Sequence, residues 1–392
     1  MSFLNCGQIT GLGTSHKDKR QLNFCARQED PCVCLGVKSA VPCPAIEYAN
    51  ITGTLLITGG CGFVGSNTIM RLYEKCPDLF IVNLDNLSST SAAETNIPTE
   101  IRNDSSRYAF VNGSIDDETA VGTIFSTYTV KYCIALAAWL PYEAQPYRDF
   151  ALNNVSALQL FLAYCAPHCL TPLNPTGTLE HIIYQGSGMA RFNAFHSGTT
   201  VVAESSQPHI VQLDAYTSTK TMAFQAAMYY AAAKDAQLPI TICHPDYIFS
   251  SVNAPAPEYL RSFYDTLTAE TPGQIQLNRG DRSVRTSFVH VDDVIDAYAI
   301  VLLEGCQHKI IRPANPHQIF SFYAIARKMV AAVKNISIRA DMSEWIAFTD
   351  DMGVISDHIS FDSRFAAIKN LGNCYNPVKT VDATIMEIVN AE

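Results

Sequence analysis

The sequence TLLITGGCGFVGSN (residues 54–67) joins a short apolar run to a glycine-rich turn. The apolar run suits a buried strand, and three glycines spaced three residues apart separate it from a helical pattern. Such glycines let the backbone turn sharply and bring a pyrophosphate close to the helix N-terminus, where free N–H groups favour anions. We therefore predict a dinucleotide site. The residues expected to contact the dinucleotide in this turn are Gly59, Gly62, Phe63, Val64 and Gly65.

A carboxylate ends the next apolar run. Phe80 to Leu84 reads as a second strand, and Asp85 follows it directly. A carboxylate at that place accepts hydrogen bonds from the adenosine ribose and repels a 2′-phosphate. The pattern therefore predicts NAD rather than NADP, with Asp85 and its neighbour Asn86 at the cofactor.

Strand and helix patterns alternate along the chain as far as residue 243. This alternation predicts a parallel sheet covered on both faces, and right-handed crossovers make it a Rossmann-type, doubly wound α/β fold. After Pro245 the pattern becomes irregular, which indicates a smaller C-terminal α/β lobe that binds the substrate. The expected strands are 54–58, 80–84, 108–111, 133–137, 182–185 and 239–243, and the expected helices include 154–166 and 216–236.

The expected domains follow from these patterns. Residues 1–50 form a cysteine-containing extension that we expect to be poorly ordered. The NAD-binding domain is expected to take 51–243 with 287–305, and the substrate-binding lobe 244–286 with 306–392.

Composition narrows the classes of function. The chain has 392 residues, 48% of them hydrophobic and 16% charged, which excludes disorder throughout. A net charge of -10 argues against non-specific binding to nucleic acid. No apolar run approaches the ~20 residues of a membrane span, and the N-terminus lacks the apolar core of a secretory signal. We therefore expect a cytoplasmic protein with free thiols among its 13 cysteines, and no metal site.

Tyr216 and Lys220 form a Y-x-x-x-K motif at the start of a helical pattern. Their spacing puts both side chains on one helix face, one turn apart. A nearby ammonium favours the phenolate, and a phenolate can take the proton from a substrate alcohol while a hydride leaves for the nicotinamide. Ser187, which follows the fifth strand, is placed to bond the same hydroxyl. The predicted catalytic residues are Ser187, Tyr216 and Lys220.

The ordered motifs resemble the extended short-chain dehydrogenase/reductases, specifically the NAD-dependent epimerase/dehydratase family and its nucleotide-sugar branch. TGGCGFVGSN resembles the turn of that family, IALAAW the segment after its fourth strand, and SFVHVDDV (287–294) a later strand–helix junction. The resemblance implies that Ala137, Trp139 and Asn154 line the cofactor, and that Tyr216 and Lys220 also contact it. It further implies a homodimer paired through the helices 154–166 and the one after Tyr216.

Departures from the family pattern bear on the reaction. Family dehydratases usually carry an Asp-Glu pair after the strand-end Ser or Thr, but this chain has Gly188-Met189, which disfavours dehydration. Where the family often has an Asn that contacts the substrate, this chain has Tyr247, as in 3β-hydroxysteroid dehydrogenases. Arg285, with Arg282 nearby, approximates the residue that binds the substrate diphosphate.

The resemblance implies an NAD-dependent, UDP-glucose 4-epimerase-like enzyme that transiently oxidises a sugar hydroxyl. Its expected partner is therefore a nucleotide-sugar. Three alternatives stay open: an alcohol dehydrogenase of the 3β-hydroxysteroid type, a nucleotide-sugar dehydratase, and a non-catalytic NAD-binding protein.

Overall fold

The structure of the protein is a computed structural model. It describes residues 45–187 except 142 and 144, 215–232, 237–251 except 246, 259–278, 282, 286–305, 310–311, 313, 315, 318–349 and 377–391. All of these belong to one compact unit, Cys43–Glu392. Residues 1–44, which make up most of the expected extension, lie outside the described residues, as do Gly188, Met189 and Arg285.

Seven strands of the described chain form a parallel sheet in the order β10-β6-β5-β4-β1-β2-β3. The order reverses between β1 and β4, which is where ligands bind in open α/β sheets. The predicted Rossmann-type fold is therefore confirmed. The strands are β1 (Gly53–Thr58), β2 (Leu79–Asp85), β3 (Tyr108–Asn112), β4 (Val130–Ala135), β5 (His181–Gln185), β6 (Ile240–Cys243) and β10 (Ile310–Ile311).

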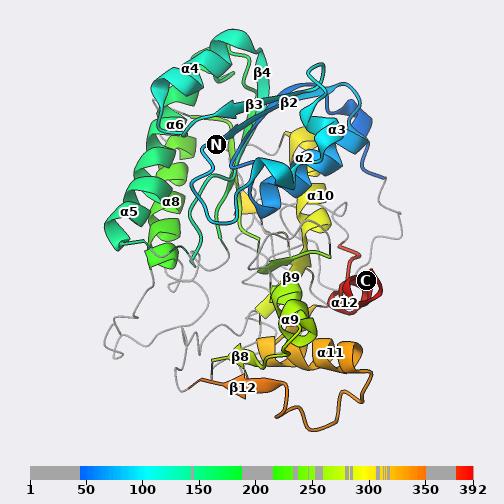
Figure 1. The fold of residues 1–392 in the computed structure, drawn as a ribbon. Coiled ribbons are helices and arrows are strands. Elements are labelled where there is room, and N and C mark those ends of the chain that lie inside the picture. Colours follow the sequence, from blue (N-terminus) through cyan, green and yellow to red (C-terminus); the bar gives the residue numbers. More distant parts are fainter. Residues whose placement is uncertain are drawn as a thin grey trace, which may run out of the picture. The chain divides into compact units, whose positions relative to one another are not determined.

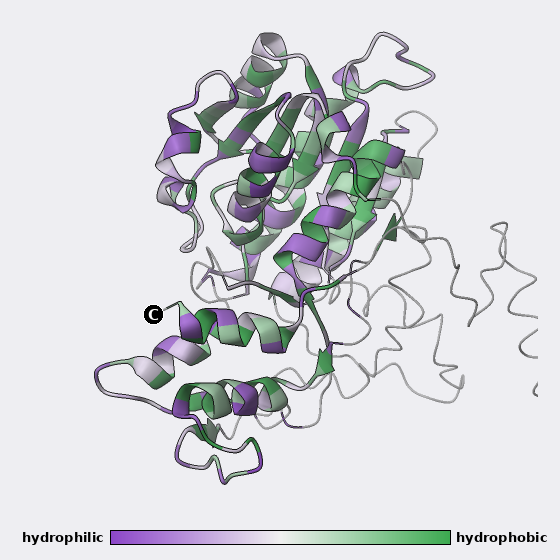
Figure 2. Cartoon of the chain, turned by 90° about the vertical axis from the view of Figure 1, so that its right-hand side faces the viewer, coloured by the Kyte–Doolittle hydropathy of each residue, from purple (hydrophilic) through white to green (hydrophobic). Residues whose placement is uncertain are grey.

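Helices cover both faces of the sheet (Figure 1). On one face lie α4 (Glu118–Thr127), α6 (Ala157–Cys165) and α8 (Ala215–Ala232); on the other lie α2 (Phe63–Lys75) and α10 (Val291–Glu304). Short elements complete this part: η1 (Tyr48–Asn50), η2 (Glu94–Asn96), α3 (Thr99–Arg102), α5 (Tyr147–Ala151), a π turn η3 (Leu152–Ser156) and η4 (Ala166–His168). In Figure 2 much of the sheet is green, for hydrophobic residues, whereas purple, for hydrophilic residues, colours outward turns of the helices.

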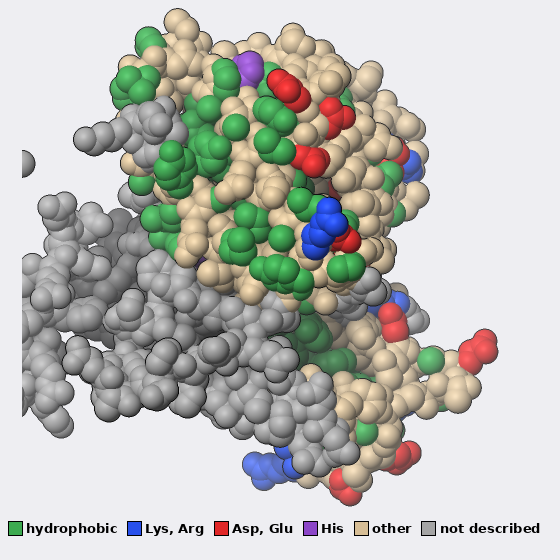
Figure 3. Space-filling model, turned by 90° about the vertical axis from the view of Figure 1, so that its left-hand side faces the viewer, with side chains coloured by type: hydrophobic (Ala, Val, Ile, Leu, Met, Phe, Trp, Pro, Cys, Tyr) green, Lys and Arg blue, Asp and Glu red, His purple; other side chains and the backbone are tan. Residues whose placement is uncertain are grey.

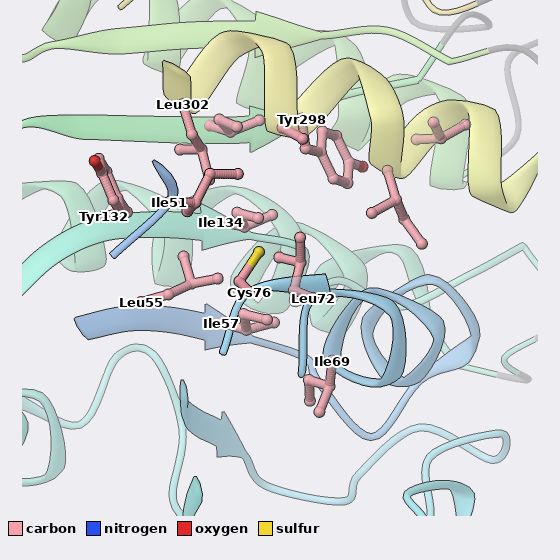
Figure 4. Close-up of a cluster of buried hydrophobic side chains, with 14 of the residues drawn as sticks. Ile51, Leu55, Ile57, Ile69, Leu72, Cys76, Tyr132, Ile134, Tyr298 and Leu302 are labelled. Atoms are coloured by element: carbon pink, nitrogen blue, oxygen red, sulfur yellow. The ribbon is translucent and has the colours of Figure 1, made fainter. Parts of the chain in front are cut away.

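Each face of the sheet has its own apolar core. Figure 4 shows one of them, in which side chains of β1 and β4 meet α2 and α10; Leu55, Ile57, Leu72 and Tyr298 are all fully buried there. Burial of strand side chains on both faces explains why β1 reads as an unbroken apolar run rather than an alternating one.

The 3₁₀ helix before β1 is tied to this core. The Tyr48 hydroxyl donates to Asp296 in a short hydrogen bond, and Arg71 of α2 pairs with the same carboxylate at 2.5 Å. Ile51 is fully buried. Within the described residues, regular structure is thus already present a few residues before the first strand, in the last part of the segment expected to be an extension.

The strands and helices predicted for the sheet region are present, but several of their predicted boundaries are wrong. The expected strand 133–137 is observed at Val130–Ala135, so Ala137 lies beyond its end. The expected helix 154–166 begins at Tyr147 and contains the π turn. The helix after Tyr216 ends at Ala232, and residues 233–236 lie outside the described residues.

A third apolar cluster forms the C-terminal part. It contains a three-stranded sheet of order β11-β9-β7, a two-stranded β12-β8 pair and three helices. These elements are β7 (Tyr247–Phe249), α9 (Tyr259–Thr268), β8 (Ile275–Leu277), β9 (Thr286–His290), β11 (Ile319–Phe320), α11 (Phe322–Lys334), β12 (Ile346–Phe348) and α12 (Val381–Asn390). None of the helices among the described residues is both long and apolar enough to span a membrane.

Candidate active site

The glycine turn between β1 and α2 is packed too tightly for side chains. Gly59 has a φ of +70°, and a Cβ there would lie 2.8 Å from the Cα and the N of Ala137. A Cβ on Gly65 would collide with the carbonyl oxygen of Gly59. The first glycine thus permits a left-handed turn against the end of β4, and the last lets the helix pack onto that turn.

Helix α2 begins at this turn with no side chain capping its N-terminus. Gly62 is the N-cap, and it offers no side-chain oxygen to the N–H groups of the first turn. Free N–H groups at a helix N-terminus, next to a backbone without side chains, suit the pyrophosphate of a dinucleotide. Phe63, Val64 and Gly65 are the first residues of the helix, where the sequence predicted cofactor contacts.

Asp85 ends β2 and turns toward the same glycine turn. Its Oδ2 accepts a hydrogen bond from the Cys61 N–H at 2.8 Å, and its Oδ1 accepts one from Leu87 N–H at 2.8 Å. Burial raises the pKa of the Asp85 carboxyl, and the two N–H donors oppose that rise. The carboxylate is therefore fixed at the strand end with lone pairs left for ribose hydroxyls. Asn86 beside it is exposed and caps Ser88 N–H at 3.1 Å.

The segment after β4 is held by β1 and by the π turn. Ala137 N–H donates to Thr58 Oγ1 at 3.3 Å. Trp139 is held on both sides by one amide, because its N–H donates to Asn154 Oδ1 at 2.7 Å and its carbonyl accepts from Asn154 Nδ2 at 3.1 Å. Asn154 Nδ2 also donates to Thr219 Oγ1 at 3.3 Å, within the Y-x-x-x-K motif. Asn154 thus joins the segment after β4 to the helix that carries Tyr216.

Lys220 is buried at the carboxyl end of β5. Its Nζ donates to the carbonyl of Gln185 at 3.2 Å and lies 5.6 Å from the ring centroid of Tyr184 and 6.0 Å from that of Tyr216. Burial lowers the pKa of Lys220 to about 8. The structure therefore places the ammonium close to two aromatic rings, one of them the predicted acid/base.

Tyr184 is a part of this site that sequence reasoning missed. Its ring is almost fully buried, and its hydroxyl has no hydrogen-bond partner among the described residues. The available signal was its position, one residue before the end of the strand that leads to Ser187. Ser187 itself is half-buried, two residues after the end of β5.

The predicted substrate residues are placed differently. Tyr247 lies in β7, where its ring stacks on Phe288 with centroids 5.6 Å apart and meets Phe322 edge-on at 4.8 Å. Arg282 is exposed, and its guanidinium lies 4.0 Å from the ring centroid of Phe348. Arg285 lies outside the described residues, so its predicted role stays a prediction.

The SFVHVDDV segment is a strand–helix junction, as the sequence indicated. His290 ends β9, and its Nδ1 accepts the Asp292 N–H at 3.1 Å to cap α10. Asp293 is buried and accepts Val378 N–H at 3.2 Å, which ties the C-terminal segment to α10. Burial raises the pKa of Asp293 to about 7.

Comparison with known proteins assigns the family. Residues 55–311 match the model of the NAD dependent epimerase/dehydratase family, so the chain belongs to that family. It is an enzyme of the extended short-chain dehydrogenase/reductase type, and its cofactor is NAD.

The individual relatives are only distantly similar to this chain in sequence. The dTDP-D-glucose 4,6-dehydratase of Bos taurus is 22% identical over 297 residues, which cover 76% of this chain and 78% of that protein. Among solved structures, dTDP-glucose 4,6-dehydratase from Bacillus anthracis in complex with NAD has a TM-score of 0.64 at 18% identity, covering 86% of this chain and 96% of the other. UDP-glucose 4-epimerase from Thermotoga maritima with UDP-glucose has a TM-score of 0.61 at 19% identity, covering 86% and 97%. These similarities confirm the fold and leave both reactions open.

Proposed function

We propose that this protein is an NAD-dependent nucleotide-sugar epimerase that acts by transient oxidation of a sugar hydroxyl. The observation that carries this proposal is the buried Lys220 ammonium close to the rings of Tyr184 and Tyr216, at the carboxyl end of the sheet whose first turn suits a pyrophosphate. Bound NAD supplies a hydride acceptor for the sugar carbon. The protein's own part is to bind the cofactor, orient the sugar and move one proton.

Tyr216 is the proposed carrier of that proton. Its phenolate oxygen takes the proton of the sugar hydroxyl, and the Lys220 ammonium stabilises the phenolate by its charge. Ser187 donates a hydrogen bond to the reacting oxygen. The proton returns from Tyr216 when the carbonyl is reduced, so the residues end each turnover as they began.

Several residues have proposed roles in holding NAD. The glycine turn and the start of α2 take the pyrophosphate, and Asp85 with Asn86 takes the adenosine ribose. Ala137, Trp139 and Asn154 line the middle of the crevice, and Lys220 binds the nicotinamide ribose. On the substrate side, we propose Tyr247 and Arg285 as contacts of the nucleotide-sugar.

A nucleotide-sugar dehydratase is the second candidate, because relatives of that name match most of the chain. Dehydration needs an acid and a base beside the oxidised sugar. Gly188-Met189 follows the strand-end serine here, and Glu143, a carboxylate in the loop after β4, is already bonded to Ser89 and Thr90. Epimerisation needs no such pair, and for this reason we favour it.

We also propose a homodimer that pairs through α5, α6 and α8. Figure 3 faces these helices and shows apolar side chains gathered over them. In this part, Tyr147 of α5 donates to Met222 Sδ of α8 at 3.6 Å. Light scattering at micromolar concentration should give twice the chain mass, and a monomer would contradict the dimer. The exposed apolar residues of this face are Tyr147, Leu152, Leu160, Met222, Met228 and Tyr229.

The proposed compartment is the cytoplasm. Every cysteine among the described residues is a buried free thiol: Cys61, Cys76, Cys133, Cys165, Cys169 and Cys243. Free thiols are usual in a reducing compartment.

The experiment that tests the function is incubation of the purified chain with UDP-glucose and with dTDP-glucose. Under our proposal, a stereoisomer of unchanged mass forms and no free NADH accumulates. Loss of water would indicate the dehydratase instead. Stoichiometric NADH with a sterol or other alcohol would indicate the dehydrogenase of 3β-hydroxysteroid type, and bound but never reduced NAD a non-catalytic protein.

A further inference from the structure

Two loops at the carboxyl edge of the sheet are bonded to each other. Glu143, in the loop after β4, accepts three hydrogen bonds on its Oε1: from Ser89 Oγ at 2.6 Å, Thr90 N–H at 3.0 Å and Thr90 Oγ1 at 3.3 Å. Ser89 and Thr90 lie in the loop after β2. Only 7% of Glu143 is exposed. A carboxylate buried with several donors is a built contact, because a charge without partners would be expensive to bury.

A second bond joins the same two loops. The Trp139 indole Nε1 donates to Ser88 Oγ at 3.1 Å. The Trp139 ring also packs edge-on against Phe150 of α5 with centroids 5.8 Å apart, and its backbone is held by Asn154. The loop after β4 is thus anchored to the helical segment that contains Phe150 and Asn154, and this anchored loop can hold the loop after β2 in place.

The order of the strands shows what the bonds between these two loops span. β1 lies between β4 and β2, and the glycine turn leaves the carboxyl end of β1. A bond between the loops after β4 and β2 therefore crosses the crevice at the end of β1. This is the crevice in which the dinucleotide of such a fold lies.

We propose that Glu143, assisted by Trp139, is a clasp that closes the dinucleotide crevice and keeps NAD resident between turnovers. This inference rests on the proposed function, since an enzyme that reduces its own oxidised intermediate has no need to exchange the cofactor. Glu143 is a positioning residue: it acts through Ser89 and Thr90 and does not contact the reacting atoms.

A clasp makes a kinetic prediction that a simple contact does not. The cofactor must pass the closed loops to enter as well as to leave. Opening the clasp should therefore raise both the association and the dissociation rate of NADH, and should change the dissociation constant less than either rate. Loss of an ordinary stabilising contact would raise only the dissociation rate.

The test is stopped-flow displacement of NADH by excess NAD, read by NADH fluorescence excited directly. Glu143→Gln should release NADH about tenfold faster and Glu143→Ala about a hundredfold faster, because a charge-assisted bond is weakened in the first and removed in the second. Trp139→Phe keeps the ring on Phe150 and removes only the bond to Ser88, so it should give a smaller increase. Association rates should rise in the same order.

Glu180→Gln is the matched control. It makes the same chemical change at the start of β5, at the opposite end of the sheet, where Glu180 pairs with Lys131 at 3.8 Å. It should leave both rates unchanged. Thermal melting without cofactor checks that the Glu143 variants are folded.

Two results would overturn the clasp: native dissociation rates in folded Glu143→Ala, or faster dissociation without faster association. A native protein that binds no NADH at all would instead refute the proposed function. The two failures are therefore distinguishable.

Discussion

The proposed cofactor side and the proposed substrate side of this molecule are built by different means. Around the glycine turn the backbone itself makes the site: Gly59 lies against Ala137, α2 starts without a side-chain cap, and Asp85 is fixed by two N–H groups. In the C-terminal part, side chains dominate, and Tyr247 packs within an aromatic cluster. A site made by the backbone tolerates few sequences, so it can be recognised from the sequence. A site made by side chains can change its ligand with each substitution.

The largest expected effect separates chemistry from binding on the cofactor side. Tyr216→Phe removes one hydroxyl and should lower turnover by about 10²–10⁴, the usual contribution of a positioned general acid/base. NAD affinity should stay native. Tyr229→Phe, at an exposed position of the same helix, is the control: it removes a hydroxyl but keeps the ring in the proposed dimer face, so turnover should stay native. Near-native turnover of Tyr216→Phe would mean that another group carries the proton.

We expect Lys220 to be required for activity and, at the same time, to lower the free energy of unfolding. Burial disfavours its charged form, so the folded pKa of about 8 lies below the ordinary 10.5. The resulting penalty is fully present below pH 8 and disappears as the pH rises from 8 to 10.5. Lys220→Met should therefore abolish activity yet raise the free energy of unfolding at pH 7 by roughly 3 kcal/mol.

Denaturant titrations at pH 7 and pH 10 measure this. The gain of Lys220→Met should shrink at pH 10. Lys328→Met is the control, since Lys328 forms a surface ion pair with Asp382 at 2.6 Å and should contribute under about 1 kcal/mol. A destabilised Lys220→Met at pH 7 would contradict the burial argument.

The third prediction compares two glycines that differ in backbone conformation and in what surrounds them. Gly59→Ala puts a Cβ against the backbone of Ala137 at positive φ and should destabilise the fold by about 1–3 kcal/mol and weaken NAD binding. Gly122→Ala in α4 meets nothing within 4 Å and should stabilise by about 0.5–1 kcal/mol. Thermal melts and NAD titrations of both variants measure this difference. Equal effects of the two substitutions would contradict the prediction.

Asp85 tests the charge rather than the shape of the cofactor side. Asp85→Asn keeps an acceptor for one N–H but loses the charge that repels a 2′-phosphate. The preference for NAD over NADP should narrow about tenfold, as expected for one charge-assisted bond. Isothermal titration of both cofactors checks this. Equal affinity of the native protein for NAD and NADP would sink the assignment.

Tyr247→Phe probes the substrate side and has the smallest expected effect. Its ring contacts with Phe288 and Phe322 remain, so the fold and NAD affinity should be retained. If the hydroxyl binds the nucleotide-sugar, KM should rise by up to about tenfold with kcat unchanged. A native KM would remove Tyr247 from the substrate contacts.

Much of the cofactor side could be predicted from the sequence, because its signals are local. The three spaced glycines lie in one strand–turn–helix unit, and Asp85 directly ends a strand. Tyr216 and Lys220 lie one turn apart in a single helix. Tyr184 and Glu143 escaped prediction because their roles depend on which strands are neighbours, not on their own segments. The start of β4 was misplaced because Lys131 interrupts its apolar pattern, although Val130 before it is fully buried.

The π turn at Leu152–Ser156 has a consequence for how this chain can change by mutation. It holds one residue more than a regular helical turn, and Asn154 lies within it. Deleting the Asn154 codon would remove this extra residue, so that 147–165 could continue as regular α-helix, and with it the amide that anchors Trp139 and reaches Thr219. The helix would become more regular while the crevice lost its anchor. We expect such a one-codon deletion to impair the proposed cofactor site while the helix that contains it stays folded.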